Sequence, residues 1–140
     1  MAGSQKQQEP PSTGGFELRP AHYPGRAPID AYGNGGFRFA DMSHHGSLLM
    51  LPSGIYAWNL AAPADLTLES FSQVIAEASD VEVLLVGTGR DIAPLQEVWR
   101  QKFRECMISA DAMATGAAVR TYNVLLAEGR AVAAALIAVD

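Results

Sequence analysis

Two short stretches of the chain combine residue types that could bind a ligand. The first is Gly87-Thr88-Gly89, which follows an apolar run and precedes a predicted helix. In open α/β sheets, backbone N–H groups of such a loop bind anions at the carboxyl end of a strand. A dinucleotide fingerprint would need a third glycine where Ile92 stands, and no Lys-Ser or Lys-Thr pair follows to complete a P-loop. The loop is therefore either a binding loop or a tight turn that needs flexible backbone.

The second stretch is Arg120, Tyr122 and Asn123 in a predicted helix. Arg120 and Asn123 are three residues apart and share one side of that helix. They could present a guanidinium and an amide to one carboxylate or phosphate. Tyr122 falls nearer the apolar stripe, where its hydroxyl needs a partner. The alternative is structural: Asn123 holds a loop backbone and Arg120 pairs with an acidic neighbour.

Other reactive side chains lack the partners that catalysis or metal binding requires. His44 and His45 would point to opposite faces of a strand, and zinc needs three or four converging ligands. Cys106 has no visible base, so it is expected to be inert. The serines of the first half lack the Gly-x-Ser-x-Gly elbow of hydrolases. We predict no catalytic residues, no metal site and no cofactor.

Length and composition favour one ordinary globular domain. The chain has 140 residues, of which 49% are apolar and 18% charged, with a net charge of −5. Its ten basic residues are scattered, which argues against nucleic-acid binding. No apolar run approaches the roughly 20 residues of a membrane-spanning helix. The single cysteine and the lack of an apolar N-terminal signal predict a cytoplasmic protein.

The chain divides into a tail and a domain. Residues 1–25 are rich in Gln, Ser, Gly and Pro and show no apolar periodicity. Such a segment buries too little surface to offset its ordering entropy, so we predict a disordered tail. Residues 26–140 form the predicted domain.

Within that domain, strand patterns alternate with helix patterns. Apolar or alternating runs predict strands at residues 29–32, 37–39, 47–51, 55–58, 81–86, 106–112 and 131–139. Residues 33–36 (GNGG) predict the turn of an N-terminal β-hairpin, since Gly and Asn tolerate positive φ. Thr67 is predicted to be the N-cap of one helix, Pro94 to lie in the first turn of a second, and Thr115 to cap a third that runs to about Glu128. This order predicts an α/β sheet with helices on its faces and the hairpin at one edge.

Three stretches of the domain resemble a known family. They are residues 46–58 (GSLLMLPSGIYAW), 83–89 (VLLVGTG) and 115–137 (TGAAVRTYNVLLAEGRAVAAALI). Together they resemble the family of small Mth-type domains of unknown function that includes mitochondrial complex I assembly factor 3 and an adipogenesis-associated domain protein. The chain is most similar to its bacterial branch. The resemblance covers about residues 29–139 and implies a single three-layer α/β domain with a central mixed sheet and no established enzyme chemistry.

The resemblance also marks individual positions. Gly87, Thr88 and Gly89 match the family's loop, and Trp58 matches its strand-end tryptophan. The helix-to-strand signature is matched by Asn123, Glu128, Gly129 and Arg130. The mitochondrial branch lacks an arginine at the place of Arg120. Two departures, Val119 for a cysteine and Ala114 for an acid, argue against chemistry at that helix start.

The leading functional hypothesis is a non-enzymatic accessory protein that helps to assemble a respiratory or other membrane protein complex. It would bind an unidentified protein partner in the cytoplasm or at the periphery of the inner membrane. The alternative is a protein or enzyme that binds an anionic small molecule between Gly87–Gly89 and the helix of Arg120. The candidate ligand or partner site comprises Trp58, Gly87, Thr88, Gly89, Arg120, Tyr122 and Asn123. A homodimer that covers a sheet edge or apolar patch is a third arrangement.

Overall fold

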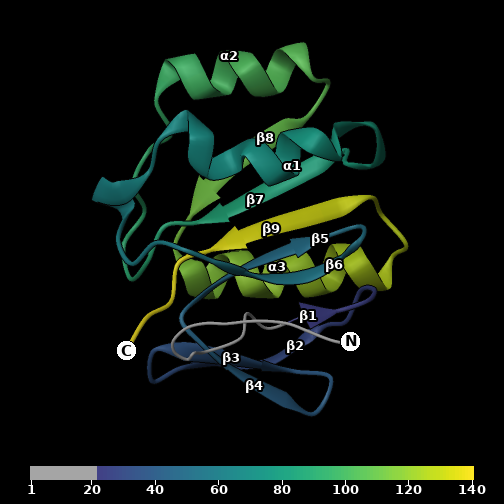
Figure 1. Ribbon diagram of the computed structural model, residues 1–140, viewed down its shortest axis with the longest axis vertical. Helices are drawn as coiled ribbons and strands as arrows, with labels where there is room; N and C mark the ends of the chain where they lie inside the picture. The colour runs from purple at the N-terminus through teal and green to yellow at the C-terminus, as the bar shows by residue number, and fades with distance from the viewer. Residues whose placement is uncertain (1–21) are drawn as a thin grey trace, which may run out of the picture.

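The computed structural model describes residues 22–140, which build two β-sheets and three α-helices (Figure 1). The strands are β1 (His22–Tyr23), β2 (Ile29–Gly33), β3 (Gly36–Phe39), β4 (Met42–His45), β5 (Ser47–Leu51), β6 (Gly54–Trp58), β7 (Val83–Gly87), β8 (Ser109–Met113) and β9 (Val132–Leu136). The α-helices are α1 (Ser72–Ala76), α2 (Glu97–Glu105) and α3 (Thr115–Ala127). Short 3₁₀ turns cover Pro63–Asp65, Leu68–Phe71 and Ala78–Asp80.

The central sheet is mixed and has the strand order β1-β6-β5-β9-β7-β8. The last strand in sequence, β9, lies in the middle, antiparallel to β5 and parallel to β7. Its residues are apolar because both faces of the sheet are covered. Along β5, Leu49 and Leu51 enter one core, whereas Leu48 and Met50 enter the other. The period-2 alternation of a strand thus supplies both cores from one run of residues.

Helices cover both faces of this sheet and make the fold three-layered. In Figure 1, α1 crosses in front of the strands and α3 lies behind them. The core on the α1 and α2 side contains Phe71, whose ring centroid lies 5.8 Å from that of Trp99 and 5.2 Å from that of Phe103. The core on the α3 side contains Tyr122 and Val119. The predicted three-layer α/β architecture with a mixed sheet is therefore confirmed.

The predicted hairpin exists, but it belongs to a separate three-stranded sheet of order β2-β3-β4 and does not extend the central sheet. Asn34 and Gly35, with φ of 53° and 80°, form its two-residue turn. Its inner face, including Phe37 and Phe39, shares the core on the α3 side. The C-terminal segment is fastened to it, because the Gly35 amide donates to the Val139 carbonyl at 2.8 Å.

Four predicted elements differ in the structure. The strand predicted at 106–112 is β8 at Ser109–Met113, because Cys106 and Met107 close the end of α2. The segment after Thr67 forms a 3₁₀ turn at Leu68–Phe71, followed by the short α1, in place of one continuous helix. In the 3₁₀ turn, the Ser70 carbonyl accepts a hydrogen bond from the Trp58 indole N–H at 2.9 Å. Pro94 precedes α2 and is not in its first turn, since the chain remains extended through Gln96. Thr115 is the first residue of α3, after the N-cap residue Ala114.

The described part of the domain begins at His22. Residues 1–21 of the predicted tail lie outside the described residues. His22 and Tyr23, which the sequence analysis assigned to that tail, pair as β1 with Tyr56 and Ile55 of β6. The central sheet thus begins before residue 26. Among the described residues, no helix is long and apolar enough to cross a membrane.

Candidate functional site

The Gly87-Thr88-Gly89 loop ends β7, and its polar groups bond within the chain. Thr88 is 1% exposed, and its amide donates to the Met113 carbonyl at 2.9 Å. The Thr88 hydroxyl donates to the Asp91 carbonyl and accepts from the Ala93 amide, both at 2.9 Å. These bonds shape the turn that leads toward α2.

Thr115, the first residue of α3, ties this loop to the strand beside it. Its hydroxyl accepts from the Gly89 amide at 2.9 Å and donates to the Ile137 carbonyl at 2.7 Å. The Thr115 amide in turn donates to the Gly89 carbonyl at 2.8 Å. A Cβ on Gly87 would meet the Thr115 Cα at 3.0 Å, so the close approach favours glycine. The amides of Thr88 and Gly89 are thus not available to an anion in this conformation.

Asn123 on α3 holds β2 in place. Its Oδ1 accepts from the Ile29 amide and its Nδ2 donates to the Ile29 carbonyl, both at 2.8 Å. The amide side chain therefore satisfies both backbone groups of one residue, as a neighbouring strand would. Nearby, the buried Tyr122 hydroxyl lies 3.5 Å from the Ala27 carbonyl, and burial raises the pKa of Tyr122 to about 12. Both side chains thus fasten the residues that lead into β2 to α3.

Arg120 is the one predicted site residue whose charged group is exposed. Its Nη1 lies 3.5 Å from the position that a Cβ on Gly116 would take, and the Tyr32 hydroxyl occupies that same place. No ion pair is found for Arg120 among the described residues. Arg120 thus faces Tyr32 of β2 along α3, and Val124 follows it one turn later on the same side.

Trp58 lies apart from these residues, because it packs in the core on the opposite face of the central sheet. It is 6% exposed, and its ring lies 5.8 Å from the ring of Phe71. A shallow hollow of about 250 Å³ borders it, lined partly by Asn59 and Gln73. The structure therefore does not bring Trp58 together with Gly87–Gly89 or with α3.

The two histidines occupy β4 with different surroundings. His44 is half-buried, and its Nε2 lies 3.0 Å from the Ser47 carbonyl. Burial lowers the pKa of His44, and its hydrogen bond to Ser47 opposes that shift. His45 is exposed. Across residues 22–140, no group of three His, Cys, Asp or Glu side chains is placed to hold a metal ion.

A polar cluster that the sequence analysis did not assemble links the β5–β6 turn to α1. The Ser53 hydroxyl donates to a Glu77 carboxylate oxygen at 2.5 Å and lies 2.6 Å from the Tyr56 hydroxyl. The Ser53 amide donates to the other Glu77 oxygen at 3.0 Å. The Glu77 carboxylate thus accepts hydrogen bonds from both the hydroxyl and the amide of Ser53. Only the tertiary fold brings Glu77 to this turn, so sequence spacing offered no signal.

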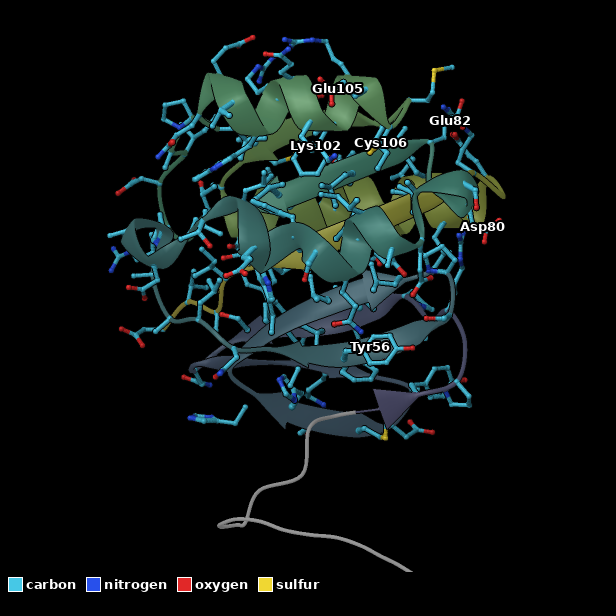
Figure 2. The ribbon with its side chains drawn as sticks, turned by 45° about the horizontal axis from the view of Figure 1, so that its top comes forward. Tyr56, Asp80, Glu82, Lys102, Glu105 and Cys106 are labelled. Atoms are coloured by element: carbon cyan, nitrogen blue, oxygen red, sulfur yellow. The ribbon has the colours of Figure 1, made fainter. Side chains whose placement is uncertain are left out.

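A larger hollow of about 580 Å³ lies at the other end of the sheet from the Gly87–Gly89 loop. Figure 2 shows Cys106, at the end of α2, with Asp80 and Glu82 on the segment opposite. Cys106 is half-buried and lines this hollow beside Met107. The titratable residues that line the hollow with Cys106 are Asp80 and Glu82, and no histidine is among them.

Comparison with known sequences identifies related proteins. Residues 29–137 match a family described as protein of unknown function (DUF498/DUF598). An uncharacterized protein of Rhodobacter capsulatus is 37% identical over 82% of this chain and 87% of its own length. NADH dehydrogenase (ubiquinone) 1 alpha subcomplex assembly factor 3 is 32% identical in mouse over 87% of this chain, and 34% identical in human over 78%. The match spans only 66% and 59% of the length of these two assembly factors.

Solved structures share the fold. A crystal structure from Bartonella henselae, described as an outer membrane protein, has a TM-score of 0.82 and 60% identity over 85% of this chain and 100% of its own. The solution structure of a Mth938-like domain from Bordetella pertussis has a TM-score of 0.72 and 30% identity, covering 80% of this chain and 85% of that one. The arrangement of α3 against two sheets therefore belongs to a fold that these proteins have in common.

Proposed function

Because this chain belongs to the DUF498/DUF598 family of proteins of unknown function, we propose that it is a non-enzymatic accessory protein that binds other proteins. It would assist the assembly of a respiratory or other membrane protein complex. The observation that carries this proposal is the similarity to complex I assembly factors over most of the described domain. The location predicted from the sequence, the cytoplasm and the periphery of the inner membrane, forms part of the proposal.

The geometry of the predicted site supports protein binding over small-molecule binding. The polar groups of Thr88, Gly89 and Asn123 are engaged inside the chain, which removes the donors that an anionic ligand would use. The alternative small-molecule site thus rests on Arg120 alone. Native mass spectrometry of the purified protein tests that alternative, since a bound anionic metabolite would appear as a defined added mass.

We place the partner-binding surface on the outer side of α3. This α3 face consists of Tyr32, Arg120 and Val124, with Tyr32 42% and Val124 56% exposed. Tyrosine and arginine are enriched where protein interfaces derive most of their binding energy. Exposed apolar area beside a guanidinium without an ion-pair partner in residues 22–140 suits a partner that presents a carboxylate next to an apolar side chain.

The test is affinity capture from solubilised membranes and cytosol of the native cell, read by mass spectrometry. We expect subunits of a membrane complex to be recovered with the wild type and lost with Arg120→Glu. Arg38→Glu is the matched control, because Arg38 of β3 is an exposed arginine on the side of its strand opposite to the buried Phe37 and Phe39, outside the α3 face. Recovery of no reproducible protein partner would overturn the proposed function. Equal recovery with both variants would move the interface away from the α3 face.

A further inference from the structure

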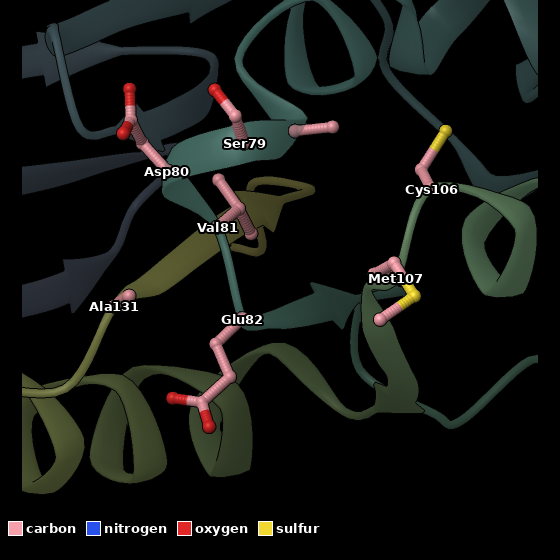
Figure 3. Close-up of a pocket in the computed structure, with 8 residues that line it drawn as sticks. Ser79, Asp80, Val81, Glu82, Cys106, Met107 and Ala131 are labelled. Carbon is pink, nitrogen blue, oxygen red and sulfur yellow. The ribbon is translucent and has the colours of Figure 1, made fainter.

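The hollow at the end of the central sheet is built by the segments that lead into three parallel strands. Ala78–Val81 lies on one side, Cys106 and Met107 lie on the other, and Ala131 precedes β9 (Figure 3). Its walls combine apolar side chains, Val81 and Met107 among them, with the polar Ser79 and Asp80, and its volume of about 580 Å³ would admit a large side chain. The lining contains no buried polar side chain that would orient a small ligand. These properties favour an apolar side chain as the occupant.

Met107 gives the hollow an exposed apolar border. Its side chain is 86% exposed, and its φ is 63°. It stands directly after the C-cap of α2, where its amide donates to the Arg104 carbonyl and the next amide donates to the Phe103 carbonyl. Glycine usually occupies this position of a Schellman motif, as Gly129 does after α3. Methionine at such a place supplies a flexible, polarizable contact surface that glycine would not.

The charges around the hollow are mainly acidic. Asp80 and Glu82 line it, and Glu105 directly precedes Cys106. Glu82 is paired with Arg130 at 3.4 Å, and Lys102 lies one turn before Cys106 on α2. Asp80 and Glu105 have no ion-pair partner among the described residues. An acidic border repels an anionic membrane surface and attracts a cationic segment.

We propose that this hollow, lined by Asp80, Val81, Cys106 and Met107, docks an apolar and basic segment of a protein partner. An apolar side chain of that segment enters the hollow against Met107. A neighbouring lysine or arginine meets the carboxylate of Asp80. The inference rests on the proposed function, because it names the chemistry of a segment that the accessory protein binds, on a surface separate from the α3 face.

The experiment uses two peptides as probes of the ¹⁵N-labelled full chain. The first has the sequence KLLKLLK, and the second is its charge-reversed counterpart ELLELLE. In NMR titrations we expect the basic peptide to shift the amide signals of Asp80, Cys106, Met107 and Ala131, and the shifts to shrink as salt is added. The acidic peptide should leave those signals in place. Equal shifts from both peptides, or shifts confined to other surfaces, would overturn the inference.

Two variants localise the effect. Met107→Gly should weaken binding of the basic peptide by about fivefold or more, the loss expected for an interface residue that contributes substantially. Val98→Ala is the matched control, since Val98 is an exposed apolar residue of α2 outside the hollow, and it should bind like the wild type. Unchanged binding by Met107→Gly would contradict the inference.

The peptide titration separates this inference from the proposed function, because it requires no cellular partner. Partners captured equally well by wild type and Met107→Gly, together with no peptide binding, would reject the hollow and leave the accessory role standing. Peptide binding at the hollow without any captured partner would reject the accessory role alone.

Discussion

The Asn123 side chain makes the pair of backbone hydrogen bonds that a neighbouring strand would otherwise make. It bonds both backbone groups of Ile29, a residue that is only 4% exposed. Removing the amide leaves a buried N–H and a buried C=O without partners, and each such group destabilises the fold by about 1–3 kcal/mol. The single side chain thus contributes to the attachment of β2.

We therefore expect Asn123→Ala to lower the free energy of unfolding by about 2 kcal/mol or more. Urea denaturation followed by circular dichroism measures this change. The neighbouring Val124→Ala, at a 56% exposed position, serves as the control and should change stability little. Equal stability of Asn123→Ala and wild type would show that the two hydrogen bonds between Asn123 and Ile29 do not stabilise the fold.

The helix ends of α2 and α3 allow a paired prediction, because both close with the same hydrogen-bond pattern. Met107 adopts φ of 63°, a region that side chains with a Cβ disfavour, whereas Gly129 adopts φ of 75°. Met107→Gly should raise the stability by about 0.5–1 kcal/mol, and Gly129→Met should lower it by a similar amount. Thermal unfolding of both variants tests the pair, and a destabilised Met107→Gly would contradict it.

His44 should make stability depend on pH. Burial, the larger cause, lowers its pKa from the usual 6.5, so the folded state resists protonation that the unfolded state accepts. Between 6.5 and the lower folded pKa, the unfolded state binds more protons, and stability falls as the pH falls. The contribution of His44 is complete above 6.5.

The measurement is the free energy of unfolding at a series of pH values from neutral to mildly acidic. His44→Gln should reduce the fall in the free energy of unfolding as the pH is lowered. His45→Gln should keep most of that decline, since burial of His44 outweighs the charge on His45. A wild-type curve that does not decline in this window would argue against the assignment.

At the scale of elements, Thr115 joins three of them. Its hydroxyl connects the end of β7, the start of α3 and the residue after β9 through two hydrogen bonds, and its side chain is fully buried. Valine keeps the shape but loses both bonds, so the Gly89 amide and the Ile137 carbonyl become unsatisfied. The junction, which the sequence suggested as a ligand loop, therefore has a structural explanation.

Thr115→Val should destabilise the protein by about 2 kcal/mol and increase amide hydrogen exchange at Gly89. Thr115→Ser, which retains the hydroxyl, should preserve much of the exchange protection. Hydrogen exchange followed by NMR gives the readout for both variants. Protection at Gly89 that is equal in wild type and Thr115→Val would rule out this role.

At the scale of the whole molecule, β8 is the terminal strand of the central sheet and pairs only with β7 among the described strands. Asp111 is exposed at its middle residue. Two copies pairing antiparallel through this strand would bring two Asp111 carboxylates together, and directly opposed like charges destabilise a strand pair. A charged residue on an outer strand is a common protection against self-pairing.

We expect Asp111→Thr to increase association with rising protein concentration, relative to wild type. Asp91→Thr is the control, because Asp91 is an exposed aspartate in a loop. Light scattering over a range of concentrations measures the mass. A wild-type dimer that Asp111→Thr leaves unchanged would contradict this view of β8. The homodimer considered from the sequence stays a prediction until that measurement.

The sequence by itself determined the local elements of the central sheet. Apolar runs predicted β5, β7 and β9 because a strand buried on both faces must be apolar along its whole length. The Asn34-Gly35 turn and the Gly129 cap were predictable because positive φ strongly favours those residue types. The three-layer order and the relationship to assembly factors followed from the motifs along the chain.

Only the tertiary structure decided which polar side chains remain available to bind a ligand or a partner. Asn123 bonds Ile29 across 94 positions, and Thr115 bonds Ile137 across 22. Periodicity reports which way a side chain faces along its own element, and it carries no information about the distant backbone that the element meets. The hollow beside Met107 arises in the same way, from three connections that converge at one end of the sheet.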